Sequence, residues 1–197
     1  MNFIYEYFRK TKETYISLQY FFKSINNIKN NINMDLLYLK HMIDQISINS
    51  LIKININFIG DIKLDYHHSV EDIGIIMGKL FKYFINIYYK NKLNRYGFYY
   101  VPLDDSLSRT VIDISGRSYL SYNLFYYNLY ISNFNINLFY DFFLSFSNNS
   151  NITIYIDNLI GFNIHHIFES IFKSFGRSIK IALSLKKNKN TTKGIIF

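Results

Sequence analysis

A pair of adjacent histidines followed by a glutamate occurs twice in this chain, and this repeat constrains the fold more than any other feature. The first copy, HHSVEDIGIIMGKLF, begins at His67, and the second, HHIFESIFKSFGRSI, begins at His165. They lie 98 positions apart in a chain of 197 residues and use four of its five histidines. A period of half the chain indicates a duplicated unit that builds the same elements twice.

The segments that precede each motif also agree between the two halves. Apolar runs at 52–60 and 151–161 predict strands. Helical patterns at 36–50 and 135–147 precede those strands. Further strands are expected at 13–22, 108–115 and 118–127. Helices interleaved with short strands predict an α+β fold, built as two tandem halves that each pack helices on one face of a sheet.

The predicted organisation of the chain follows the repeat. The first half-repeat spans residues 1–93 and the second spans residues 94–185, with a hinge near residues 91–100. Residues 186–197 form a polar tail that contains KKNKNTTKG. We expect this tail either to fray or to close over a bound anion such as a phosphorylated substrate.

Composition excludes several classes of function. The chain has no cysteine, which excludes disulfides and thiolate metal sites. No apolar run reaches the ~20 residues that a membrane-spanning helix needs, and no signal peptide is evident, so we expect a cytoplasmic protein with no membrane partner. The net charge of +8 suits a phosphorylated ligand or nucleic acid. A/T-rich codon bias explains the many lysines equally well.

The spacing within each motif suits metal ligation. On a helix His67 and Glu71 share a face, whereas the adjacent His68 points roughly 100° away. Each helix therefore offers ligands in two directions, and two such helices could build two metal sites, within one subunit or between subunits. Imidazole and carboxylate ligands without sulfur favour Mn, Fe or Zn over Cu(I).

The fifth histidine fits the same pattern. His41 lies on the helix predicted before the first motif, and Asp141 occupies the equivalent position before the second motif. A single helical histidine is more often a surface or core residue than a ligand. A symmetric set in a duplicated chain is hard to explain in that way, so the sequence predicts divalent metal binding.

The chain resembles the imidazoleglycerol-phosphate dehydratase family. The matching segments follow one another along nearly the whole chain: RKTKET at 9–14, HMIDQ at 41–45, GDIKLDYHHSVEDIGIIMGKLF at 60–81, RYG at 95–97, VPLDDSL at 101–107, DISGRSYL at 113–120, DFFLSF at 141–146, GFNIHHIFESIFKSFGRS at 161–178 and TTKG at 191–194. The resemblance implies the metal-dependent dehydration of D-erythro-imidazoleglycerol phosphate to imidazole acetol phosphate in histidine biosynthesis. It also implies a ribosomal protein S5 domain 2-like fold and a homo-oligomer, in the family a shell of 24 subunits.

The family site holds two Mn2+ ions, and other divalent metals are possible. The ligands that the resemblance implies are His41, His67, His68, Glu71, Asp141, His165, His166 and Glu169. Asp141 stands where the family has a histidine, and a carboxylate is an acceptable ligand for a hard divalent ion. Other departures from the family pattern are Lys40, Asn49, Tyr155 and the Asp104-Asp105 pair.

The resemblance also implies roles for residues that do not bind metal. It assigns removal of the carbon-bound proton to Glu13, and the two motif glutamates, Glu71 and Glu169, are counted with it as catalytic. The implied substrate-binding residues are Glu13, Arg95, Arg117, Lys173, Thr191, Thr192 and Lys193. Guanidinium groups suit phosphate because they bind it through two parallel hydrogen bonds. Taken singly, each of these charged residues is more often an ordinary surface residue.

Two other functions are consistent with parts of the sequence. A basic RNA-binding or ribosomal protein would explain the charge and a doubled α+β fold. It would not explain the paired motifs, so we expect a small phosphorylated imidazole substrate and no nucleic-acid partner. A remnant that assembles without turnover would keep the motifs, and an activity assay separates it from an enzyme.

Overall fold

The elements of the two halves follow the same order along the chain. The computed structural model describes residues 3–22, 30–50, 52–60, 66–88, 93–124 and 130–185. The first half contains β1 (Phe3–Lys10), β2 (Thr14–Phe22), β3 (Asn31–Asn33), α1 (Leu37–Asn49), β4 (Ile52–Gly60) and α2 (His67–Tyr88). The second contains β5 (Tyr96–Leu103), β6 (Ser106–Asp113), β7 (Tyr119–Asn123), β8 (Tyr130–Ile131), β9 (Phe134–Asn135), α3 (Leu138–Ser150), β10 (Thr153–Ile160) and α4 (Ile164–Ala182).

Each half builds a four-stranded sheet with the same connectivity. The strand orders are β1-β2-β4-β3 and β5-β6-β10-β7. In the first sheet β3 runs parallel to β4, in the second β7 runs parallel to β10, and the other pairs are antiparallel. The short β8–β9 hairpin is an insertion in the second half alone among the described residues. The predicted α+β fold with two tandem halves is therefore confirmed.

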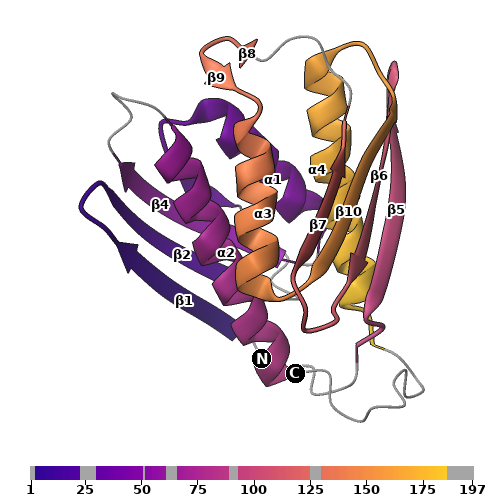
Figure 1. The fold of residues 1–197 in the computed structure, drawn as a ribbon. Helices are drawn as coiled ribbons and strands as arrows, with labels where there is room; N and C mark the ends of the chain where they lie inside the picture. The colour runs from indigo at the N-terminus through magenta and orange to yellow at the C-terminus, as the bar shows by residue number, and fades with distance from the viewer. Residues whose placement is uncertain are drawn as a thin grey trace.

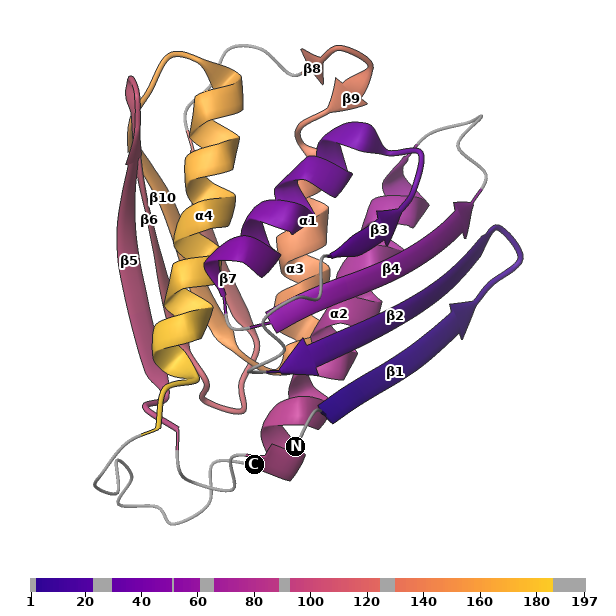
Figure 2. The ribbon, with the colours of Figure 1, turned by 180° about the vertical axis from the view of Figure 1, so that it is seen from behind.

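The four helices lie between the two sheets (Figures 1 and 2). Helices α1 and α2 cover one face of the first sheet, and α3 and α4 cover one face of the second. Alternate residues of β4, from Ile52 to Phe58, point into the core, as the period of a half-buried strand requires. None of the described helices is both long and apolar enough to cross a bilayer.

The helices of one half pack against the helices of the other, because two matching glycines allow close approach. In α2 a Cβ at Gly78 would lie 2.6 Å from the carbonyl oxygen of Phe146 in α3. In α4 a Cβ at Gly176 would lie 2.9 Å from the carbonyl oxygen of Ile46 in α1. Only glycine fits contacts this close. The shared glycine of the two motifs thus fixes the pairs α2 with α3 and α4 with α1.

Five of the described strands were not predicted from the sequence, namely β1, β3, β5 and the two-residue strands β8 and β9. β1 lies in a segment for which no element was expected, and β3 has only three residues. β5 occupies residues 96–100 of the predicted hinge, so only residues before 96 can serve as the connection. The residues expected to form the substrate-closing tail, including Thr191, Thr192 and Lys193, lie outside the described residues.

Candidate metal centre

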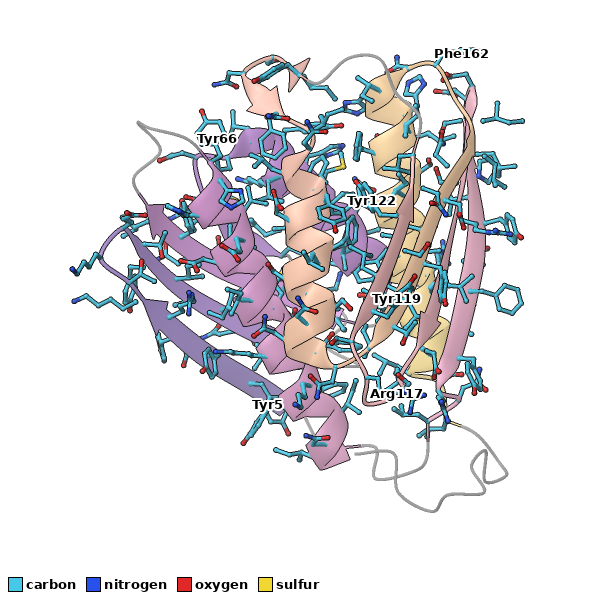
Figure 3. The ribbon with its side chains drawn as sticks, in the orientation of Figure 1. Tyr5, Tyr66, Arg117, Tyr119, Tyr122 and Phe162 are labelled. Atoms are coloured by element: carbon cyan, nitrogen blue, oxygen red, sulfur yellow. The ribbon has the colours of Figure 1, made fainter. Side chains whose placement is uncertain are left out.

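Both histidine motifs begin their helices at the same end of the helix layer. Tyr66, which precedes α2, and Phe162, which precedes α4, lie at this end, whereas Arg117 lies towards the opposite end (Figure 3). His67 is the first residue of α2. In α4 the side chain of Asn163 accepts a hydrogen bond from the backbone N–H of His165 at 2.9 Å, which caps the helix. The starts of α2 and α4 therefore place both motifs at the same end of the helix layer.

His41, His165 and Glu169 converge on one point. Nε2 of His165 lies 3.1 Å from Oε2 of Glu169, and Nε2 of His41 lies 3.6 Å from the same oxygen. The two imidazole rings stack with centroids 5.5 Å apart. One ligand atom from each residue falls within 4.8 Å of the others. This donor set fits a divalent metal ion, because ions of this kind take imidazole nitrogen and carboxylate oxygen together at about 2.0–2.2 Å.

Helix geometry explains how the three residues meet across the two halves. Gly176 lies eleven residues after His165, about three turns of an α-helix, so both face α1. In α1, His41 lies eight residues, about two turns, before Asn49, which contacts Gly176. The close crossing at Gly176 therefore brings His41 opposite His165, and Glu169 follows four residues later on the same face.

The surroundings of Glu169 keep it ionised. Burial alone would raise the pKa of this carboxyl, but Lys173, His41 and His165 outweigh burial and lower it. The ammonium of Lys173 donates to Oε1 at 2.8 Å, which leaves Oε2 facing the two histidines. An ionised carboxylate with one oxygen directed at two imidazoles is the state that a metal ion requires.

The equivalent site in the other pair of helices is less tightly gathered. Nδ1 of His67 lies 3.3 Å from Oδ2 of Asp141, so α2 and α3 reproduce the contact between α4 and α1. Glu71 occupies the place of Glu169, four residues after the first histidine. Among the described residues, however, these three do not reach the mutual spacing of the first triad. The sequence-predicted ligands thus form one convergent triad and one partial counterpart.

The second histidine of each motif points away from these clusters, as predicted. Nδ1 of His68 lies 2.7 Å from Oε2 of Glu13 in the β1–β2 turn. Nδ1 of His166 lies 2.6 Å from Oδ1 of Asp105 in the β5–β6 turn. Hydrogen bonds from the backbone N–H of Asn163, from His166 and from the backbone N–H of Phe162 lower the pKa of Asp105 far below its ordinary value.

Asp105 was not among the predicted site residues. The sequence marked it only as part of a departure from the family pattern. The repeat does carry a signal that identifies it: Asp105 immediately precedes β6 as Glu13 immediately precedes β2. The structure makes these two carboxylates counterparts, since each meets the second histidine of the motif in its own half.

Both predicted phosphate-binding arginines lie far from this triad within one chain. Arg95 donates to Asp113 through Nε at 2.6 Å and Nη2 at 3.0 Å. Asp113 ends β6 and Asp105 precedes it, and the eight residues of this strand span roughly 26 Å. Arg117 lies near the same far end (Figure 3). Lys173 alone of the three described cations contacts the triad, through Glu169.

A cavity of about 410 Å³ adjoins the triad and exposes His41 and His165 to it. Its other walls include Tyr38, Tyr66 and the β8–β9 hairpin. The ring of Tyr38 lies 5.6 Å from that of His165, and its buried hydroxyl has no hydrogen-bond partner. Burial, and secondarily the charge of Glu169, raises the pKa of this hydroxyl. Tyr38 is therefore neutral and carries an unsatisfied polar atom.

Replacing Tyr38 by phenylalanine should stabilise the chain. Tyr38→Phe removes a buried hydroxyl without a partner, which should raise the free energy of unfolding by about 1 kcal/mol. For a chain of this size, that corresponds to roughly 2–4 °C in Tm. Thermal unfolding of the metal-free protein followed by circular dichroism measures it. Tyr140→Phe, at a tyrosine that is 43% exposed, is the control and should change Tm little. A lower Tm for Tyr38→Phe would contradict this prediction, because it would mean that the hydroxyl of Tyr38 makes a stabilising hydrogen bond in the folded protein.

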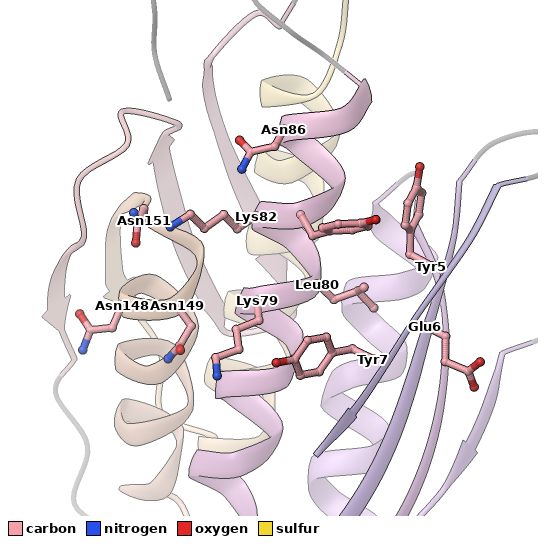
Figure 4. A pocket seen from close by; sticks show the side chains of 11 residues that line it. Tyr5, Glu6, Tyr7, Lys79, Leu80, Lys82, Asn86, Asn148, Asn149 and Asn151 are labelled. Carbon is pink, nitrogen blue, oxygen red and sulfur yellow. The ribbon is translucent and has the colours of Figure 1, made fainter. Parts of the chain in front are cut away.

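A larger cavity, of about 730 Å³, lies elsewhere, between β1, α2 and the end of α3 (Figure 4). Lys79 and Lys82 line it, and Lys82 extends towards Asn151. Its lining contains no histidine, and its one carboxylate, Glu6, accepts a hydrogen bond from Gln19 at 2.9 Å. The larger cavity therefore lacks the ligands that the smaller one has.

Comparisons with known proteins agree with this geometry. The profile of the family "Imidazoleglycerol-phosphate dehydratase" matches residues 35–179. A dehydratase of this name from Vesicomyosocius okutanii is 43% identical over 176 residues, which cover 89% of this chain and 90% of the relative. One from Chromobacterium violaceum is 48% identical over 145 residues, 74% of this chain and 73% of the relative.

Two solved structures share the fold. Imidazoleglycerol-phosphate dehydratase from Staphylococcus aureus N315 superposes with a TM-score of 0.80 at 35% identity, covering 93% of this chain and 99% of that one. IGPD from Pyrococcus furiosus, solved in complex with (S)-C348, gives a TM-score of 0.82 at 28% identity, covering 96% and 99%. With its duplicated fold and its histidine-glutamate triad, this chain belongs to the imidazoleglycerol-phosphate dehydratase family of hydro-lyases.

Proposed function

We propose that this chain dehydrates D-erythro-imidazoleglycerol phosphate to imidazole acetol phosphate in histidine biosynthesis, and that the reaction depends on divalent metal. The observation that carries the proposal is the convergence of His41, His165 and Glu169 from two halves of the chain. A protein that only bound nucleic acid through its charge would have no need of this arrangement.

Two groups of residues would hold the metal ions, which we propose to be two Mn2+ per site. The first group is His41, His165 and Glu169, and the second is His67, Glu71 and Asp141. His68 and His166 would complete the ligand sets of neighbouring subunits, because they point away from their own clusters. When bound, the ions would hold the imidazole ring of the substrate by its nitrogens and stabilise the negative charge that develops in it.

Glu13 is the base in this proposal. Its carboxylate would accept the proton from the substrate carbon while the electron pair of that C–H bond expels the hydroxyl of the neighbouring carbon. The departing hydroxide takes up a proton from solvent and leaves as water, and Glu13 returns its proton to solvent. The resulting enol then becomes the ketone. The side chain of Glu13 is 57% exposed in a hairpin turn and contacts His68, so a substrate held beside His68 can reach it.

The phosphate would be bound by cations from different places in the fold. Lys173 lies next to the triad. Asp113 engages Nε and Nη2 of Arg95 and holds the guanidinium in a fixed orientation, which leaves Nη1 for a phosphate oxygen. Arg117, Thr191, Thr192 and Lys193 complete the proposed set. Arg95 and Arg117 lie roughly one strand length from the triad of their own chain, so they would serve the site of another copy.

This division of the site between copies supports a homo-oligomer, which we propose to be a shell of 24 subunits. The outer face of the second sheet exposes Phe98, Tyr100, Tyr119 and Tyr155. Phe162, beside the second motif, is 91% exposed. Large apolar patches of this kind mark association surfaces.

An anaerobic metal analysis paired with a dehydration assay tests the proposed function. The purified chain loaded with Mn2+ should convert the substrate to a product lighter by one water, as measured by mass spectrometry. Fe2+ and Zn2+ loaded in parallel show whether Mn2+ is preferred. Protein that binds metal stoichiometrically but yields no product would be an inactive remnant of the family, and the proposal would fail.

A further inference from the structure

The two carboxylates that meet the outward-facing histidines differ in how firmly they are held. Glu13 and Asp105 occupy equivalent positions, each immediately before the second strand of its half. Each accepts a hydrogen bond from Nδ1 of a motif histidine, at 2.7 Å for His68 and 2.6 Å for His166. The two pairs are therefore equivalent arrangements in the two halves.

Backbone N–H groups fix the carboxylate of Asp105, whereas no backbone N–H of the described residues bonds to the carboxylate of Glu13. Oδ2 of Asp105 accepts from the backbone N–H of Phe162 at 2.7 Å and of Asn163 at 2.8 Å, the residues that lead into α4. Its other oxygen remains for His166. The carboxylate of Glu13 is more exposed, 57% against 30%, and its nearest hydrogen-bonded support, from Thr11, reaches only its backbone N–H.

This anchoring determines which nitrogen of His166 carries the proton. An ionised carboxylate can only accept, so Nδ1 of His166 donates to it, and in the neutral imidazole Nε2 then carries the lone pair. The carboxylate of Asp104 approaches Nε2 only to 3.5 Å, beyond the usual length of a hydrogen bond to nitrogen. Nε2 thus remains open to a ligand from outside the chain.

We propose that Asp105 is a positioning residue, which locks His166 in the tautomer and orientation that bind a metal ion through Nε2. The proposal rests on the proposed metal-dependent function. Partners of this kind orient metal-binding histidines and raise their basicity.

Asp105→Asn tests the proposal with a change of few atoms. The amide oxygen can still accept from the backbone N–H groups of Phe162 and Asn163, so the turn and α4 should remain folded. The amide NH2 then faces Nδ1 of His166 and donates to it, which moves the ring proton to Nε2 and blocks ligation. Affinity for Mn2+, measured by competition with a chromogenic chelator, should fall about 10–100-fold.

The control is Glu6→Gln, the same chemical change at an exposed carboxylate that accepts a hydrogen bond from Gln19. Its Mn2+ affinity should equal that of the unaltered chain, since Glu6 is bonded to none of the proposed ligands. His166→Asn and the double variant with Asp105→Asn complete the comparison. If Asp105 acts through His166, the double variant should bind Mn2+ as weakly as His166→Asn alone and no more weakly.

The outcomes separate this inference from the proposed function. An unchanged Mn2+ affinity in Asp105→Asn, or a further loss in the double variant, overturns the positioning role while the dehydratase proposal stands. Absence of Mn2+ binding by the unaltered chain overturns both. The tautomer itself is read from the 15N shifts of the His166 ring in the metal-free protein, and a proton on Nε2 in the unaltered chain would also contradict the proposal.

Discussion

Glu13→Gln should lower kcat by about 10²–10⁴-fold while substrate binding changes little. Glutamine keeps the size and one acceptor oxygen of the side chain, but it cannot accept the proton from the substrate carbon. Glu13 lies in the exposed β1–β2 turn beside His68, and the described structure shows no backbone donor that fixes its carboxylate. Turnover under saturating Mn2+ and substrate affinity by calorimetry measure the two effects separately.

Glu6→Gln is the matched control for this prediction. Glu6 is an exposed carboxylate on the neighbouring β1 and accepts a hydrogen bond from Gln19 at 2.9 Å. The same loss of charge at this position should leave kcat near that of the unaltered chain. A Glu13→Gln variant with near-normal turnover would remove Glu13 from the role of base, even if the dehydration itself were established.

The sequence predicted the candidate ligands better than it predicted how they combine. The repeat identified His41 and Asp141 as companions of the two motifs. It did not reveal that His41 of the first half meets His165 and Glu169 of the second. This combination of ligands depends on the packing of α4 against α1, which the periodicity of either helix does not reveal. A local trace of it is the glycine shared by both motifs, which sits where another helix approaches.

β5 escaped prediction for a physical reason. A half-buried strand is recognised by alternating apolar and polar residues, but this strand exposes Phe98, Tyr99 and Tyr100 in a row. Its fully buried position is Gly97, where a Cβ would lie 2.0 Å from the carbonyl oxygen of Ser178 in α4. Close packing of α4 thus removed the inward side chain that would have marked the strand. The segment that contains RYG was therefore predicted to be part of a hinge.

Removal of divalent metal should abolish dehydration and dissociate the assembly into smaller oligomers. His68 and His166 point away from the clusters of their own chain. Under the proposed function they bind ions held by neighbouring subunits, so each ion joins two chains. Loss of the ions would leave apolar surface, such as the exposed Phe98 and Phe162, to hold the copies together. Light scattering coupled to size exclusion, after treatment with EDTA, measures the mass, and the dehydration assay measures activity on the same sample.

EDTA already saturated with Mn2+ is the control, because it should change neither mass nor activity. Adding Mn2+ to the stripped protein should restore both, since the helices that carry the ligands are held by apolar packing and by the close crossings at Gly78 and Gly176. Activity that survives stripping would contradict metal dependence. An assembly that keeps its mass while activity disappears would place all ligands of each ion within one chain. His68 and His166 would then need another role, and their carboxylate partners would be the first place to look for it.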